Sequence, residues 1–174
     1  MDEDEEGYQW YTSFDQLGEL LERPNPTEAL DWLMGVLRHI VDECGYQADK
    51  IHLFGFAQGG SVAAELALKW WRAQSREVNK KALGSVVTIS GPLLSYPTIA
   101  PDARCPTPCL VRRGSGGLAD EVTALKKGYT QVEETRMAGA EMPRTQDGWR
   151  PIMAFWGGVL SRQVGSGEVY EVVR

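Results

Sequence analysis

The feature that most restricts how this chain can fold is the turn within Phe54-Gly-Phe-Ala-Gln-Gly-Gly60. The apolar run Ile51-His-Leu-Phe54 before it predicts a buried strand, and the apolar spacing over residues 58–73 after it predicts a helix. The layout is Gly-x-Ser-x-Gly, with Ala57 at the serine position. The alternative is a glycine-rich turn that binds phosphate at a helix N-terminus. Neither Gly-x-Gly-x-x-Gly nor Gly-Lys-Ser/Thr is present, so the nucleotide-binding motifs fit poorly.

Apolar runs alternate with periodic helical segments along the rest of the chain. The predicted strands cover residues 50–56, 83–90, 108–112, 131–137 and 168–173. The predicted helices cover residues 14–21, 25–44, 58–73, 120–127 and 148–160. Residues 131–137 are the most polar of the central strands, which favours a place near a sheet edge. This alternation predicts an α/β fold, a mostly parallel sheet with helices on both faces.

Composition indicates one domain and excludes several functions. Residues 1–7 predict an acidic flexible tail, and residues 8–174 a single domain. The net charge of −6 argues against nucleic-acid binding. The three cysteines, Cys44, Cys105 and Cys109, do not form a disulfide framework or a complete metal-ligand set, so we expect no metal and no cofactor. No apolar run reaches the length of a membrane span, and we expect the protein in the cytoplasm or the nucleus.

The segment Gly55 to Gly60 resembles the signature Gly-Phe-Ser-Gln-Gly-Gly of the phospholipase/carboxylesterase/thioesterase family of α/β-hydrolases at every position but one. The likeness extends to Ile89-Ser-Gly-Pro-Leu93, to Cys105-Pro-Thr-Pro-Cys-Leu-Val-Arg-Arg-Gly114 and to residues 152–160. It implies an α/β-hydrolase-like fold in which the turn at Ala57 is the nucleophile elbow.

Each catalytic position departs from the family pattern. Ala57 has no oxygen with which to attack a carbonyl carbon. In the family a His-Gly pair precedes the acid by about three residues, whereas Arg113-Gly114 here is followed by no acid until Asp120. The family's histidine lies between the last strand and the last helix, where the resemblance places Glu141 as a degenerate base position.

The order of residues along the chain also argues against a triad. The α/β-hydrolase order is nucleophile, acid, histidine. The two histidines of the chain, His39 and His52, both precede the elbow. The family's strands before the elbow are not recognisable here, nor is the loop that supplies the second oxyanion-hole donor. We therefore expect an N-terminally truncated fold, in which the remaining elbow is formed by Gly55, Ala57, Gln58, Gly59 and Gly60.

Two functions follow from these departures. The first is a catalytically inactive serine-hydrolase-like protein, a pseudoenzyme that binds a protein partner completing the free sheet edge or a small acyl ligand. The second is a carboxylic ester or thioester hydrolase with a non-standard nucleophile, for which Ser61, Ser90 and Ser95 are the nearest hydroxyl groups. The loss of all three triad members favours the first.

Overall fold

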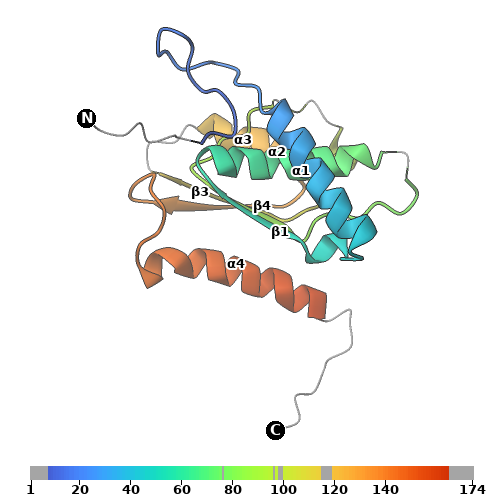
Figure 1. Ribbon diagram of the computed structural model, residues 1–174. Coiled ribbons are helices and arrows are strands. Elements are labelled where there is room, and N and C mark those ends of the chain that lie inside the picture. Colours follow the sequence, from blue (N-terminus) through green and yellow to red (C-terminus); the bar gives the residue numbers. More distant parts are fainter. Residues whose placement is uncertain (1–7, 76, 96, 98–99, 115–118, 165–174) are drawn as a thin grey trace.

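The centre of the molecule is a four-stranded parallel sheet in the order β1-β2-β3-β4. The computed structural model describes residues 8–75, 77–95, 97, 100–114 and 119–164 (Figure 1). The strands are β1 His52–Phe56, β2 Ser85–Ile89, β3 Cys109–Gly114 and β4 Val132–Met137. All neighbouring strands run parallel, which confirms the predicted α/β class.

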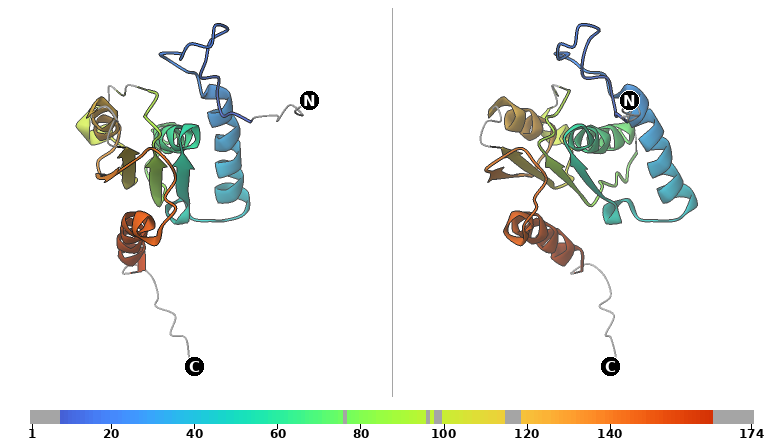
Figure 2. Two further views of the ribbon diagram at one scale, coloured as in Figure 1. Left: turned by 90° about the vertical axis from the view of Figure 1, so that its left-hand side faces the viewer. Right: turned by 60° about the vertical axis from the view of Figure 1, so that its left-hand side comes forward.

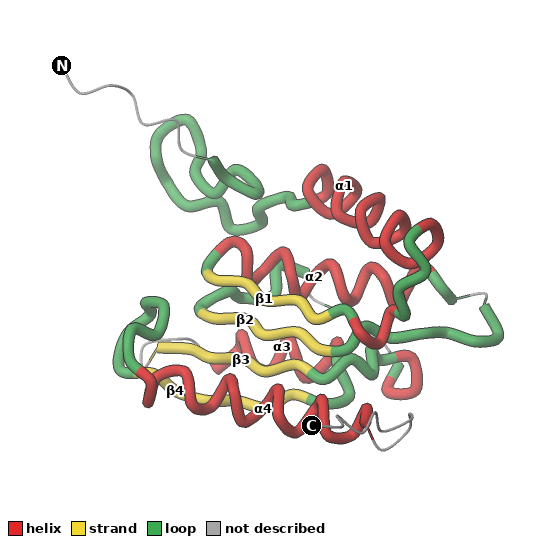
Figure 3. The backbone as a smooth tube through the Cα atoms, turned by 60° about the horizontal axis from the view of Figure 1, so that its bottom comes forward, coloured by secondary structure: helices red, strands yellow, loops and turns green. Residues whose placement is uncertain are grey.

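The sheet has helices on both faces. The helices are α1 Thr27–Arg38, α2 Gln58–Ala73, α3 Ala119–Gly128 and α4 Gln146–Val164. Helices α2 and α3 cover one face and α4 lies on the other, while α1 packs beside α2 at the β1 side of the molecule (Figures 2 and 3). A five-residue π-helical turn, His39–Glu43, extends α1, and short 3-10 turns occur at Ala48–Lys50 and Pro101–Ala103.

Two apolar clusters hold these layers together. The larger lies under α2 and includes Leu68, Leu125 and Tyr129, none of them more than 1% exposed. The smaller joins Val87, Ile89 and Leu110 of the central strands to α4 through Ile152, Phe155 and Val159. The central strand β2 is buried along its whole length, as expected of a strand covered by helices on both faces.

Several predicted elements shift or change. Residues 14–21 do not form the predicted helix. They make a tight turn closed by a Phe14–Leu20 bridge, because Gly18 adopts a φ of 80° and the Asp15 carboxylate accepts the amide hydrogens of Leu17 and Glu19. On α4 the buried apolar side chains are Ile152, Phe155 and Val159, whereas Leu160 is exposed. The predicted strand at residues 168–173 and the tail at residues 1–7 lie outside the described residues.

Strand β1 lies at one edge of the sheet and β4 at the other, as predicted for β4. Backbone hydrogen bonds join the Ala57 amide to Ile89 and the Gly84 amide to the Ile51 carbonyl. Because successive residues of a strand direct their backbone groups to opposite sides, the intervening residues His52, Phe54 and Phe56 direct theirs away from β2. No described strand pairs with β1 on that side.

Candidate functional site

Ala57 lies in the sharp turn between β1 and α2 with φ 50° and ψ −122°. Its amide donates to the Ile89 carbonyl at 2.8 Å, and its own carbonyl accepts the amides of Gly60 and Ser61. A non-glycine residue in such a region is strained by about 1–3 kcal/mol. The backbone therefore has the shape of a nucleophile elbow, with a methyl group where a nucleophile would project.

Two of the three elbow glycines are required by close contacts. A Cβ at Gly55 would lie 2.1 Å from the Gly59 carbonyl oxygen, and one at Gly60 would lie 2.6 Å from the Thr88 hydroxyl. A Cβ at Gly59 would meet only the Trp10 indole, at 3.4 Å. Across the turn, Gly91 packs so closely that a Cβ there would lie 2.6 Å from the Ala57 carbonyl oxygen. The tight helix–sheet contact is therefore retained around a position without a nucleophile.

The side chain of Gln58 binds the N-terminal segment. Its Oε1 accepts the amide of Trp10 at 3.0 Å, and its Nε2 donates to the carbonyl of Tyr11 and to the hydroxyl of Ser13. The residue that follows the nucleophile position therefore fastens residues 10–13 next to the elbow. This contact could not be predicted from the sequence, in which position 58 shows only a polar residue with both a donor and an acceptor.

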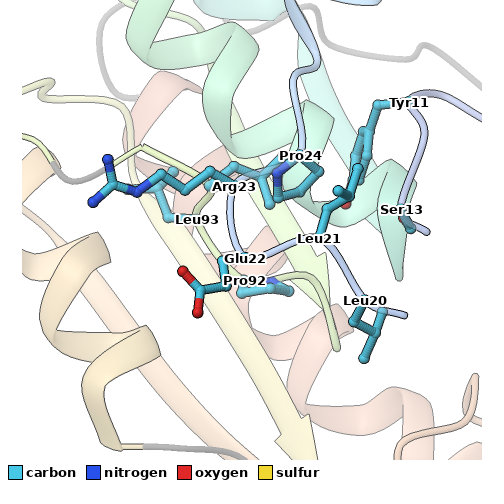
Figure 4. A pocket seen from close by; sticks show the side chains of 10 residues that line it. Tyr11, Ser13, Leu20, Leu21, Glu22, Arg23, Pro24, Pro92 and Leu93 are labelled. Carbon is cyan, nitrogen blue, oxygen red and sulfur yellow. The ribbon is translucent and has the colours of Figure 1, made fainter. Parts of the chain in front are cut away.

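A cavity of about 730 Å³ lies between this N-terminal segment and the loop after β2 (Figure 4). Its volume is in the range of small-molecule sites. The lining is mainly apolar, with the charged Glu22 and Arg23 among it. The lining residues are Tyr11, Ser13, Leu20, Leu21, Glu22, Arg23, Pro24, Pro92, Leu93 and Leu94.

The loop between β4 and α4 approaches the elbow region from the other side. The Ser90 hydroxyl donates to the carbonyl of Ala140 at 2.9 Å, and Ser90 has a φ of 52°. Glu141, which follows Ala140, lies between β4 and α4, the interval in which the resemblance places the family's histidine. Its exposed carboxylate pairs with Arg144 at 3.0 Å. A role for Glu141 as a degenerate base position stays a prediction.

The segment matched to the family's acid loop begins with an ion pair. Arg113 at the end of β3 binds Glu134 of β4 at 2.8 Å, and this hydrogen bond lowers the pKa of the Glu134 carboxyl. Residues 115–118, which would carry the loop onward, lie outside the described residues. Arg113 therefore contributes to pairing of β3 with β4.

Both histidines are occupied away from the elbow. His52 is the first residue of β1, and its Nδ1 lies 2.9 Å from the hydroxyl of Ser85 on β2. Burial lowers the pKa of the His52 imidazole, and the nearby charge of Lys50 lowers it further. His39 Nδ1 lies 2.8 Å from Glu43 on the π-helical turn.

The remaining nucleophile and ligand candidates are also placed. Ser61 is buried in the first turn of α2, and its hydroxyl has no partner. Cys105 and Cys109 are buried free thiols, and burial raises the pKa of each. Within the described part of the chain, no group of three His, Cys, Asp or Glu side chains is arranged to hold a metal ion. No described helix is both long enough and apolar enough to cross a membrane.

Two charged residues of the described part of the chain, Glu65 and Arg112, are buried, and neither was predicted to be so from the sequence. Arg112 is only 4% exposed and follows directly after the apolar residues 109–111 of β3. An arginine within the run Cys109-Leu-Val-Arg112 was the available signal, because arginine is almost never fully buried without a partner.

The fold is that of solved esterases. The structure matches esterase PE8 with a TM-score of 0.61 and 18% identity, over 88% of this chain and 71% of that one. It matches the Zea mays acyl-protein thioesterase 2 at 0.57 and 18%, over 87% and 72% of the two chains. It matches a Bacillus cereus carboxylesterase at 0.58 and 16%, over 84% and 68%. The chain has the α/β-hydrolase fold. This confirms the predicted fold class.

The amino-acid sequence is also similar to that of a protein from Mycosarcoma maydis. An uncharacterized hydrolase of Mycosarcoma maydis is 33% identical over 156 residues, which are 86% of this chain. This chain spans 56% of that relative's length. No protein-family model matches the present chain.

Proposed function

We propose that this chain is a catalytically inactive α/β-hydrolase-like protein that serves as a binding module. The observation that carries the proposal is Ala57, which occupies the strained nucleophile position with only a methyl group. The likeness to esterases and to a thioesterase supports the fold of a serine hydrolase, and the chemistry at residue 57 argues against its activity.

The positions of the histidines support the same conclusion. A general base must come within about 2.6–3.2 Å of the group that it deprotonates. His52 is five residues before Ala57 along β1, which corresponds to roughly 16 Å of extended strand. It also faces Ser85, at the opposite end of the strand from the elbow. His39 pairs with Glu43 before β1 begins.

Neither Ser90 nor Ser95 is hydrogen-bonded to a histidine among the described residues. Ser90 donates its hydroxyl hydrogen to the Ala140 carbonyl. Ser95 donates to the buried carboxylate of Glu65, which also accepts the Ser95 amide at 2.6 Å, as expected of a structural contact that fixes the loop after β2. An unactivated serine is a poor nucleophile.

Two surfaces offer themselves for binding. The apolar cavity beside the elbow suits a small acyl ligand, since most of its lining is hydrocarbon. The free edge of β1 suits an extended segment of a partner polypeptide, because its unpaired backbone groups accompany two phenylalanines, Phe54 and Phe56, that are each 39% exposed. Trp149 and Trp156 of α4 stand against Phe54, with ring centroids 5.9 Å from it, and extend this apolar surface.

The test is the hydrolysis of p-nitrophenyl butyrate by the purified protein and by an Ala57→Ser variant. We expect neither to exceed the buffer rate, because restoring the hydroxyl restores neither the base nor the acid. Titration calorimetry with the same ester reports whether the uncleaved ester binds.

Turnover by the unmodified protein would contradict the proposal and favour a non-standard nucleophile. The Ser90→Ala and Ser61→Ala variants would then identify it. Turnover by Ala57→Ser alone would show that a working base and acid remain, and that only the nucleophile has been lost.

A further inference from the structure

Arg112 is a buried cation without an anionic partner. Its side chain lies on the α4 face of β3, the same face as Leu110, because alternate residues of a strand share a face. Its Nη1 donates to the Gly148 carbonyl at 2.6 Å, and its Nε has no partner. No carboxylate of the described residues forms an ion pair with it. Burial without a counter-charge lowers the pKa of the guanidinium.

A second unsatisfied polar atom lies beside it. Thr135 is the register partner of Arg112 on β4, so both side chains lie on the same face of the sheet. The Thr135 hydroxyl is buried and has no partner either. Two neighbouring buried donors without acceptors are rare in folded proteins, because each loses its bonds to water when it is buried.

Arg112 lines a cavity of about 420 Å³ under the loop between β4 and α4. Met137, Met142 and Pro143 contribute apolar walls. Thr145 directly precedes α4, and Gly148 lies in its first turn. Arg136 and Arg144 add positive charge to the lining, although each is paired with a carboxylate, Arg136 with that of Glu134 at 3.7 Å. The lining acid is Glu141, and its carboxylate is already paired with Arg144. The balance of charge around the cavity is therefore positive.

We infer that this cavity binds a small anion, a carboxylate or a phosphate, whose oxygens accept from the guanidinium of Arg112. The guanidinium is the side chain best suited to such oxygens, because its donors form a planar fork. The positive end of the α4 dipole favours an anion at the same place. The site does not involve Ala57, so it does not depend on the proposed loss of catalysis.

The test is the thermal unfolding midpoint as a function of sodium phosphate or sodium acetate concentration, with sodium chloride keeping the ionic strength constant. We expect a saturable increase with at least one of the two anions, and the arm that responds identifies the ligand class. In Arg112→Met the apparent affinity is expected to fall about thirtyfold or more, because a buried charge-assisted contact is lost. Arg150→Met, which removes an exposed arginine of α4 paired with Asp147, is the matched control and is expected to bind normally.

The Arg112→Met variant is expected to fold, because methionine replaces an unpaired buried charge with apolar volume. If it does not fold, the Nε–Hε nuclear magnetic resonance signals of the unmodified protein give an independent answer. A saturable shift of one protected arginine Nε signal supports the site. No saturable response to either anion, or an equal response in Arg112→Met, would overturn it and leave a bound water as the partner of Nε.

Discussion

Replacing Ala57 with glycine is expected to stabilise this protein, although glycine normally destabilises. At φ 50° and ψ −122° the alanine Cβ is strained by about 1–3 kcal/mol, and glycine removes that strain. The greater freedom of glycine in the unfolded chain offsets about 0.4–1 kcal/mol of this gain. The net expectation is an increase in the free energy of unfolding of roughly 0.5–2 kcal/mol. For a chain of this size, each kcal/mol raises the unfolding midpoint by about 2–4 °C.

Urea unfolding followed by tryptophan fluorescence measures this change, since the chain has 6 tryptophans. The matched control is Ala154→Gly at an exposed position inside α4, which is expected to lose about 1 kcal/mol. A loss of stability in Ala57→Gly as large as that in Ala154→Gly would refute the expectation that glycine relieves strain at residue 57. That result would mean that the backbone at residue 57 is relaxed and that the elbow geometry is not retained in solution.

Two further substitutions test the surroundings of the elbow. Gln58→Ala removes the three hydrogen bonds that hold residues 10–13, so limited chymotrypsin cleavage in that segment is expected to accelerate about tenfold. Gln131→Ala is the control, and equal cleavage rates for Gln58→Ala and the unmodified protein would show that other contacts hold the segment. Phe56→Lys places a charge on the edge of β1, so any concentration-dependent self-association measured by sedimentation velocity is expected to decrease. The control Leu17→Lys changes an exposed apolar residue far from the strand in sequence and is expected to leave self-association unchanged. Identical sedimentation of Phe56→Lys and the unmodified protein would argue against an edge that can pair with another strand.

The sheet was predictable because its strands are buried and apolar. The run at Ile51 and the run before Ser90 are short, bounded by glycine and separated by a strongly periodic helix, which leaves few alternatives to a parallel sheet. The turn at Gly18 was not predictable in the same way. Its apolar residues have helical spacing, but the Asp15 carboxylate competes for the backbone amides and the positive φ of Gly18 ends any helix there.

The candidate site was predictable only where the backbone decides it. The need for glycine at positions 55 and 60 follows from contacts within the turn, so the elbow could be read from the sequence. The contacts of Gln58 with residues 10–13 and the burial of Arg112 depend on segments that are distant along the chain. Nothing in local spacing encodes those distances, which is why both were found only in the structure.

The most direct test of lost catalysis is treatment of the unmodified protein with a serine-reactive fluorophosphonate, followed by intact-mass measurement. The reagent forms an adduct only with an activated hydroxyl, and subtilisin serves as the positive control. We predict no added mass under conditions that label the control fully. A stoichiometric adduct that maps to a serine such as Ser90 or Ser61 would contradict it, because it would show an activated nucleophile next to Ala57.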